Sequence, residues 1–122
     1  MTLQEAIDRF DQLYPNALAQ HVKRRILSDF DGRLYTEVLS LYEGAPAAFS
    51  GYGEDAAPHT PLLAGYPYDD IYVLLLCAEN DAVNGDIERY NNASLLLNAA
   101  YERYVNHLNR TRRRKQSARV TC

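Results

Sequence analysis

Apolar residues recur at helical spacing along most of the chain, except in one central segment rich in proline and glycine. Near the start, Leu3, Ile7, Phe10 and Tyr14 follow one another at intervals of four, three and four residues. Residues spaced in this way share one face of an α-helix, and 122 residues fit a single domain. The sequence therefore predicts an all-α fold: a small antiparallel bundle of four to five helices with a long central loop and an extended basic C-terminal arm.

Two helices are expected before the central segment. Thr2 and Glu5 have the spacing of a capping box, with Thr2 as the N-cap of the first helix. A second apolar stripe predicts one long helix over residues 17–43, capped by Asn16 and either bent or broken at Gly32. That stripe consists of Leu18, Val22, Ile26, Phe30, Leu34, Val38 and Leu41.

Two more helices are expected after the central segment. The third begins at Asp69 or Asp70, and it should be the most buried because residues 71–77 are apolar on every face. Asn84 and Gly85 end it, and the fourth helix begins at or just before Asp86. Its apolar seam has alternating spacings of three and four, which is typical of bundle packing. The seam consists of Ile87, Tyr90, Ser94, Leu97, Tyr101, Tyr104 and Leu108.

The central loop, residues 45–67, is long for a domain of this size. Its prolines and glycines argue against a regular element, with a short strand or hairpin as a weaker alternative. The loop nevertheless contains five large apolar or aromatic residues that suit packing rather than linking. These are Phe49, Tyr52, Leu62, Leu63 and Tyr66. They are expected to pack either on the chain's own helices or on a neighbouring copy.

The charge of the chain is divided unevenly. Residues 1–109 carry 7 basic and 16 acidic side chains, whereas residues 110–122 carry 6 basic and no acidic ones. The basic side chains of this arm are Arg110, Arg112, Arg113, Arg114, Lys115 and Arg119. Such an arm suits contact with a nucleic-acid backbone or with an acidic protein surface. A second cluster, residues 23–25, is expected to be a solvated helical face.

The sequence does not predict an enzyme. Asp29 and Asp31 lie two apart on a helix and so point to different faces. None of the three histidines (His21, His59, His107) has a second histidine or a cysteine three or four residues further on, so local metal-ligand spacing is missing. No catalytic residue, metal ligand or cofactor is therefore expected. Cys77 lies in an apolar run and is expected to be a small buried hydrophobic residue.

Several segments together resemble phage and prophage head–tail connector (adaptor) proteins. Three of them lie in the last third of the chain: residues 68–74 (YDDIYVL), 84–92 (NGDIERYNN) and 98–101 (NAAY). A fourth, residues 27–33 (LSDFDGR), precedes Glu37-Val38. These are patterns of packing and capping, not catalytic signatures.

The resemblance implies a structural virion protein of the neck region, present in the host cytoplasm during assembly. Such a subunit forms a ring, commonly of twelve copies, that lies under the portal protein and extends the channel for genomic DNA. The ring docks the tail or a stopper protein and reads no DNA sequence. On this reading residues 1–109 form the helical connector domain, residues 110–122 form the portal-binding arm, and the central loop contacts neighbouring subunits. No membrane is involved. The alternative is a small nucleic-acid-binding or regulatory protein that uses the basic tail.

Overall fold

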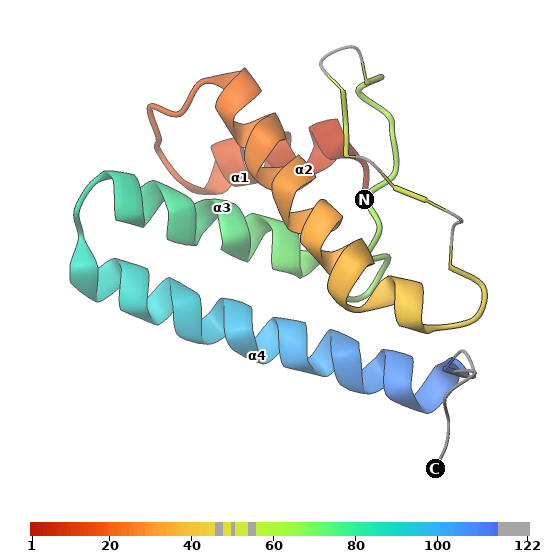
Figure 1. The fold of residues 1–122 in the computed structure, drawn as a ribbon. Coiled ribbons are helices and arrows are strands. Elements are labelled where there is room, and N and C mark those ends of the chain that lie inside the picture. Colours follow the sequence, from red (N-terminus) through yellow and green to blue (C-terminus); the bar gives the residue numbers. More distant parts are fainter. Residues whose placement is uncertain (46–47, 50, 54–55, 115–122) are drawn as a thin grey trace.

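The structure, a computed structural model, describes residues 1–45, 48–49, 51–53 and 56–114. Within them the chain forms α1 (Leu3–Leu13), α2 (Gln20–Glu37), the short 3-10 helix η1 (Leu39–Leu41), α3 (Asp70–Val83) and α4 (Ile87–Thr111) (Figure 1). The same residues contain two isolated β-bridges and no strand. The predicted all-α class is confirmed.

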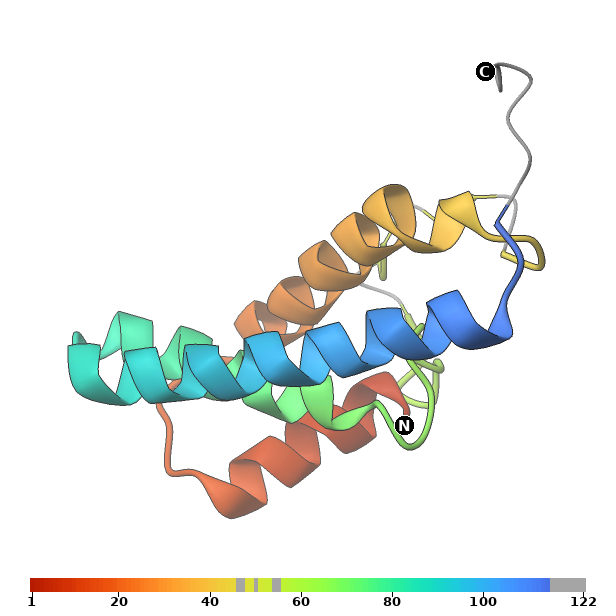
Figure 2. The same ribbon diagram turned by 90° about the horizontal axis from the view of Figure 1, so that it is seen from below.

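Helix α3 is the centre of the fold, because α1, α2 and α4 all pack against it. This position explains its all-round apolar sequence, since most of the side chains between Ile71 and Ala78 are buried. Helix α4 runs back along α3 as an antiparallel hairpin and is the longer of the two, while α1 and α2 lie on the other side of α3 (Figures 1 and 2).

The hairpin turn follows its predicted signals. Gly85 adopts a φ of +72°, a backbone conformation that favours glycine. The Asp86 side chain then accepts a hydrogen bond from the Arg89 amide at 3.1 Å and caps α4. The capping box at the start of α1 is also confirmed: Thr2 Oγ1 accepts from the Glu5 amide at 3.2 Å, and Glu5 Oε1 accepts from the Thr2 amide at 2.8 Å.

The predicted helix over residues 17–43 is wrong at both ends. Helix α2 begins at Gln20, its N-cap is Ala19, and Asn16 instead accepts a hydrogen bond from the Leu18 amide. The helix passes through Gly32 without a break and ends at Glu37, where the chain turns into η1. A stripe of strict four-residue steps rotates by about 40° at each step, so it could not stay on one face of a single long helix.

The buried face of α2 contains two charged residues among its apolar ones. Leu27, Phe30 and Leu34 are buried, but so are Lys23 and Asp31. The prediction that residues 23–25 form a solvated face is therefore wrong for Lys23, whereas it holds for the exposed Arg25. Lys23 is only 3% exposed and its Nζ lies 2.5 Å from Asp11 Oδ1.

The predicted apolar seam of α4 packs on the core in the second half of the helix, as expected, but the prediction is wrong for the first half. Tyr104 and Leu108 are buried, and Leu97 and Tyr101 pack against the core. Ile87 and Tyr90 at the start of the helix are exposed. In this half of the helix the buried side chain is the small Ala93, and larger side chains of these turns are exposed.

None of the described helices is both long enough and apolar enough to span a membrane.

Candidate functional site

The central loop is held by the buried carboxylate of Asp31. This side chain is fully buried and accepts three hydrogen bonds: from Tyr72 Oη at 2.7 Å, from the Leu63 amide at 3.1 Å and from Tyr52 Oη. Burial raises the pKa of Asp31, and the three hydrogen bonds only partly offset that effect. Asp31 also raises the pKa values of both tyrosines, after burial itself. These three hydrogen bonds, called the Asp31 latch here, join α2 to α3 and to the loop.

Asp31 belongs to a polar stripe on α2 that binds the loop. Arg24 Nη2 donates to the Ala56 carbonyl at 2.5 Å, and Ser28 Oγ accepts from the Tyr52 amide at 2.8 Å. The positions of Arg24, Ser28 and Asp31 differ by four and three residues, so they share one helix face. The loop is therefore attached by specific hydrogen bonds to one face of α2.

The five anchors predicted for the loop lie in different surroundings. Leu62 is buried, Leu63 and Tyr52 pack partly on the core, and the Phe49 ring meets the Tyr52 ring at 5.1 Å between centroids. These four contact the chain's own domain. Tyr66 differs from them, because 89% of its surface is exposed. Of the five, Tyr66 is the side chain that is available to a second molecule.

The first basic residue of the predicted arm, Arg110, lies on the last turn of α4, and the C-cap residue Arg112 has an extended backbone. The Arg113 carbonyl accepts a hydrogen bond from the Glu43 amide at 2.8 Å, and the Arg114 guanidinium lies 5.6 Å from the centre of the Tyr42 ring. Tyr42 is itself buried and donates to Asn109 Oδ1. These contacts hold the start of the arm beside η1.

The side chains of Arg110, Arg112, Arg113 and Arg114 are all exposed. They lie together at the C-terminal end of α4. Two further basic residues predicted for the arm, Lys115 and Arg119, lie outside the described residues. The described part of the arm thus presents four positive charges at one end of the molecule.

The opposite end of the α3–α4 hairpin carries large exposed apolar side chains. These exposed residues of the helix ends, called the turn-end patch here, are Leu13, Tyr14, Val83, Ile87, Tyr90, Leu95 and Leu96. They do not share one face, because Ile87 and Leu96 are nine residues apart and point to opposite sides of α4. Groups of large exposed apolar residues are candidates for interaction sites. The sequence held a signal for it: Leu95, Leu96 and Leu97 are consecutive in a helix, and with about 100° between neighbours they cannot all face the core.

A groove of about 370 Å³ runs beside this patch, between the end of α1 and the α3–α4 hairpin. Its apolar lining comes from Tyr14, Pro15, Leu74, Cys77, Ala93 and Leu96. Asn80, Asp81, Arg89 and Asn92 add polar groups. Cys77 is buried, as predicted, and burial raises the pKa of its thiol, so the thiol is not activated for chemistry.

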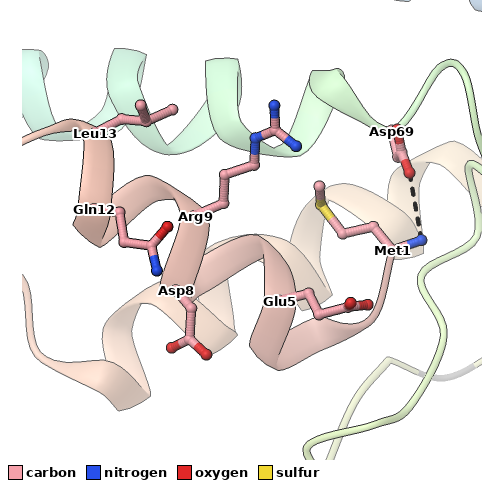
Figure 3. A pocket seen from close by; sticks show the side chains of 7 residues that line it. All are labelled: Met1, Glu5, Asp8, Arg9, Gln12, Leu13 and Asp69. Carbon is pink, nitrogen blue, oxygen red and sulfur yellow. Dashed lines mark ion pairs between the residues drawn. The ribbon is translucent and has the colours of Figure 1, made fainter.

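A larger but shallower depression lies on α1 and is shown in Figure 3. Its acidic groups are engaged in structural contacts: Glu5 belongs to the capping box, Asp8 accepts from Gln4 at 2.8 Å, and Asp69 pairs with the Met1 ammonium at 3.3 Å. The hydrogen bond from the Thr2 amide lowers the pKa of Glu5, as expected for a carboxylate that serves as an acceptor. The depression therefore gives no support to acid–base chemistry.

The ionisable groups considered for chemistry are scattered. Asp29 is exposed and lies 4.0 Å from Arg25, whereas Asp31 is buried, so the prediction of different faces is confirmed. His107 stacks on Tyr68 with 4.7 Å between ring centroids. Within the described part of the chain, no three potential metal-ligating side chains of histidine, cysteine, aspartate or glutamate come together.

Comparison of this chain with protein-family models, with curated proteins and with solved structures found no match.

Proposed function

We propose that this chain is a structural assembly protein: a head–tail connector (adaptor) subunit of a tailed phage that forms a ring under the portal. The observation that supports the proposal is that the two ends of the α3–α4 hairpin expose unlike side chains. The turn end exposes large apolar residues and the other end exposes four arginines, while Tyr66 is exposed in the loop before α3. The sequence resemblance described above supports the same assignment.

Two unlike surfaces suit a ring. Subunits that join head to tail use a different surface on each side, and such contacts close into a ring when the rotation between subunits allows it. On this proposal the subunit is an antiparallel helical bundle with an extended basic arm, and about twelve copies surround the channel, the number implied by the resemblance. The acidic body, with 16 acidic and 7 basic side chains in residues 1–109, would let genomic DNA pass without adhering.

The basic arm is the proposed contact with the portal protein. It starts from a fixed position, because the Glu43–Arg113 hydrogen bond and the Tyr42–Arg114 contact hold its first residues. Exposed guanidinium groups are well suited to carboxylates and to backbone carbonyls on a partner surface. The remaining outer face of the ring would dock the tail or a stopper protein, placing the subunit in the virion neck.

Co-expression with the portal protein of the same genome, followed by electron microscopy, tests this proposal. The expected result is a ring bound to the portal. Substituting Arg112→Gln and Arg113→Gln together should weaken that attachment, whereas Arg25→Gln with Arg33→Gln changes the net charge equally on exposed positions of α2 and should not. The proposal would be contradicted if the chain never bound the portal in any preparation. It would also be contradicted if the two double substitutions weakened attachment equally.

The exposed arginine cluster also favours a second candidate, a small protein that binds nucleic acid through this end. Charge-driven binding weakens steeply as salt rises, because each neutralised phosphate releases counterions. Salt-dependent binding of duplex DNA that is lost in the Arg112→Gln, Arg113→Gln protein, together with no binding to the portal, would select this candidate.

A further inference from the structure

We propose that the groove beside the turn-end patch receives Tyr66 of a second copy of this chain, so that subunits join head to tail. This inference rests on the proposed ring and identifies the two surfaces that form its subunit contact. It makes the turn end of one subunit the socket and the loop before α3 of the next subunit the knob.

The socket has the chemistry of a site for an aromatic side chain. Tyr14, Pro15, Leu74, Cys77 and Leu96 give it an apolar lining, while Asn80, Asp81, Arg89 and Asn92 supply polar groups. Since a water molecule occupies about 30 Å³ of liquid, a groove of about 370 Å³ has room for one or two large side chains. An apolar groove with a few polar groups fits tyrosine, which has an apolar ring and a polar tip.

The knob is Tyr66. With 89% of its surface exposed, it is the most exposed large hydrophobic residue of the described chain, and it does not fill the groove of its own subunit. Leu41, also exposed, and the described arginines of the arm lie at the same end of the hairpin. Tyrosine and arginine are the residue types that most often dominate binding energy at protein interfaces.

Charge selects a head-to-tail contact over a symmetric one. Exposed or half-exposed acidic side chains surround the turn: Glu79, Asp81, Asp86 and Glu88. One basic residue lies among them, Arg89, whose Nε is already 3.7 Å from Asp86 Oδ2. Two turn ends placed face to face would bring like charges together, which is unfavourable. A turn end placed against the arm end of a second copy meets Arg110 on the last turn of α4 instead, and Arg112 and Arg113 remain for the portal.

Complementation between two variants tests the contact. Tyr66→Ala removes the knob and Leu96→Arg blocks the socket, and both positions are exposed, so both proteins should keep the wild-type circular dichroism spectrum and urea midpoint. Each variant alone should associate at least about tenfold more weakly than the wild type in sedimentation equilibrium. Mixed together they should form dimers, because one intact knob and one intact socket remain; a symmetric contact predicts no recovery on mixing.

Cysteine cross-linking gives a second, independent test in a Cys122→Ala background, in which Cys77 is kept because it is buried and lines the socket. A mixture of Tyr66→Cys and Leu96→Cys proteins should form a disulfide between the two different chains under mild oxidation. His21→Cys, exposed at the start of α2, serves as the matched control that should not cross-link with either. The inference would be overturned if Leu96→Cys homodimers were the main product. It would also be overturned if no mixed disulfide formed at the highest soluble concentration, with or without the portal. Loss of portal binding with the mixed disulfide intact would instead contradict the proposed function alone.

Discussion

Replacing Asp31 with asparagine should weaken the attachment of the central loop by a measurable and pH-dependent amount. The carboxylate accepts hydrogen bonds from Tyr72, Tyr52 and the Leu63 amide. An asparagine oxygen still accepts from Tyr72, and the Tyr52 hydroxyl can rotate to accept. The Leu63 N–H then faces an NH₂ group and is left without an acceptor. A buried unsatisfied donor costs about 1–3 kcal/mol, out of roughly 5–15 kcal/mol for a whole domain.

The pH dependence of this cost follows from the raised pKa of Asp31. Between the ordinary value of 3.8 and the raised value in the folded protein, the unfolded chain loses its proton first. The folded wild type therefore binds more protons than the unfolded chain, and its free energy of unfolding falls as pH rises through this window. The asparagine variant lacks this contribution. Its deficit relative to the wild type should shrink as pH rises and become constant above the folded pKa.

Urea unfolding followed by circular dichroism measures the stability deficit of the variant and its pH dependence. Wild type and variant are compared at half-unit steps from pH 3.5 to 8. Asp29→Asn is the matched control, because that carboxylate is exposed on the same helix. A deficit that grows with rising pH would refute the reasoning, since it would mean that the three donors outweigh burial and stabilise the ionised carboxylate. A deficit below about 0.5 kcal/mol at every pH would refute the latch itself.

Two further substitutions test the polar contacts of α2. Lys23→Ala should cost about 1.5–3 kcal/mol in urea unfolding, because it removes a charge-assisted hydrogen bond between a buried ammonium and Asp11, whereas Arg25→Ala at an exposed pair should cost at most about 1 kcal/mol; equal costs would contradict the burial argument. Gly51→Ala should raise loop cleavage by limited proteolysis, because Gly51 has a φ of +94° and a Cβ there would lie 2.6 Å from Ser28 Oγ; an unchanged cleavage rate would count against a fixed loop.

The sequence predicted the helices well where local signals were strong. The capping box at Thr2, the turn at Gly85 and the cap at Asp86 are local interactions, and all three are confirmed. The end of α2 depends on distant contacts instead. The chain leaves the helix at Val38, and Tyr42 then becomes buried with its hydroxyl on Asn109, 67 residues further along the chain. Such a contact has no signature within α2 itself.

The candidate surfaces were harder to predict than the helices, because polarity alone does not locate a residue. Lys23 was expected at the surface, and Asp31 was expected only to face away from Asp29, yet both are buried, each with hydrogen-bonding partners supplied by other elements. Conversely, Ile87 and Leu95 are apolar and exposed. The helical period of a sequence identifies an apolar face of a helix. Whether that face is buried depends on which other helices pack against it.

The latch at Asp31 bears on the proposed contact between copies of this chain. Four of the five large loop residues are used within the domain, so on that proposal the loop contributes to a neighbour chiefly through Tyr66. The loop is also fixed to the start of α1, where the Leu3 amide donates to the Thr60 carbonyl at 2.8 Å. A loop tied in this way presents Tyr66 from a defined position, and a side chain that is already placed loses less conformational entropy on binding. Loosening the latch should therefore weaken subunit association even though Asp31 itself touches no neighbour.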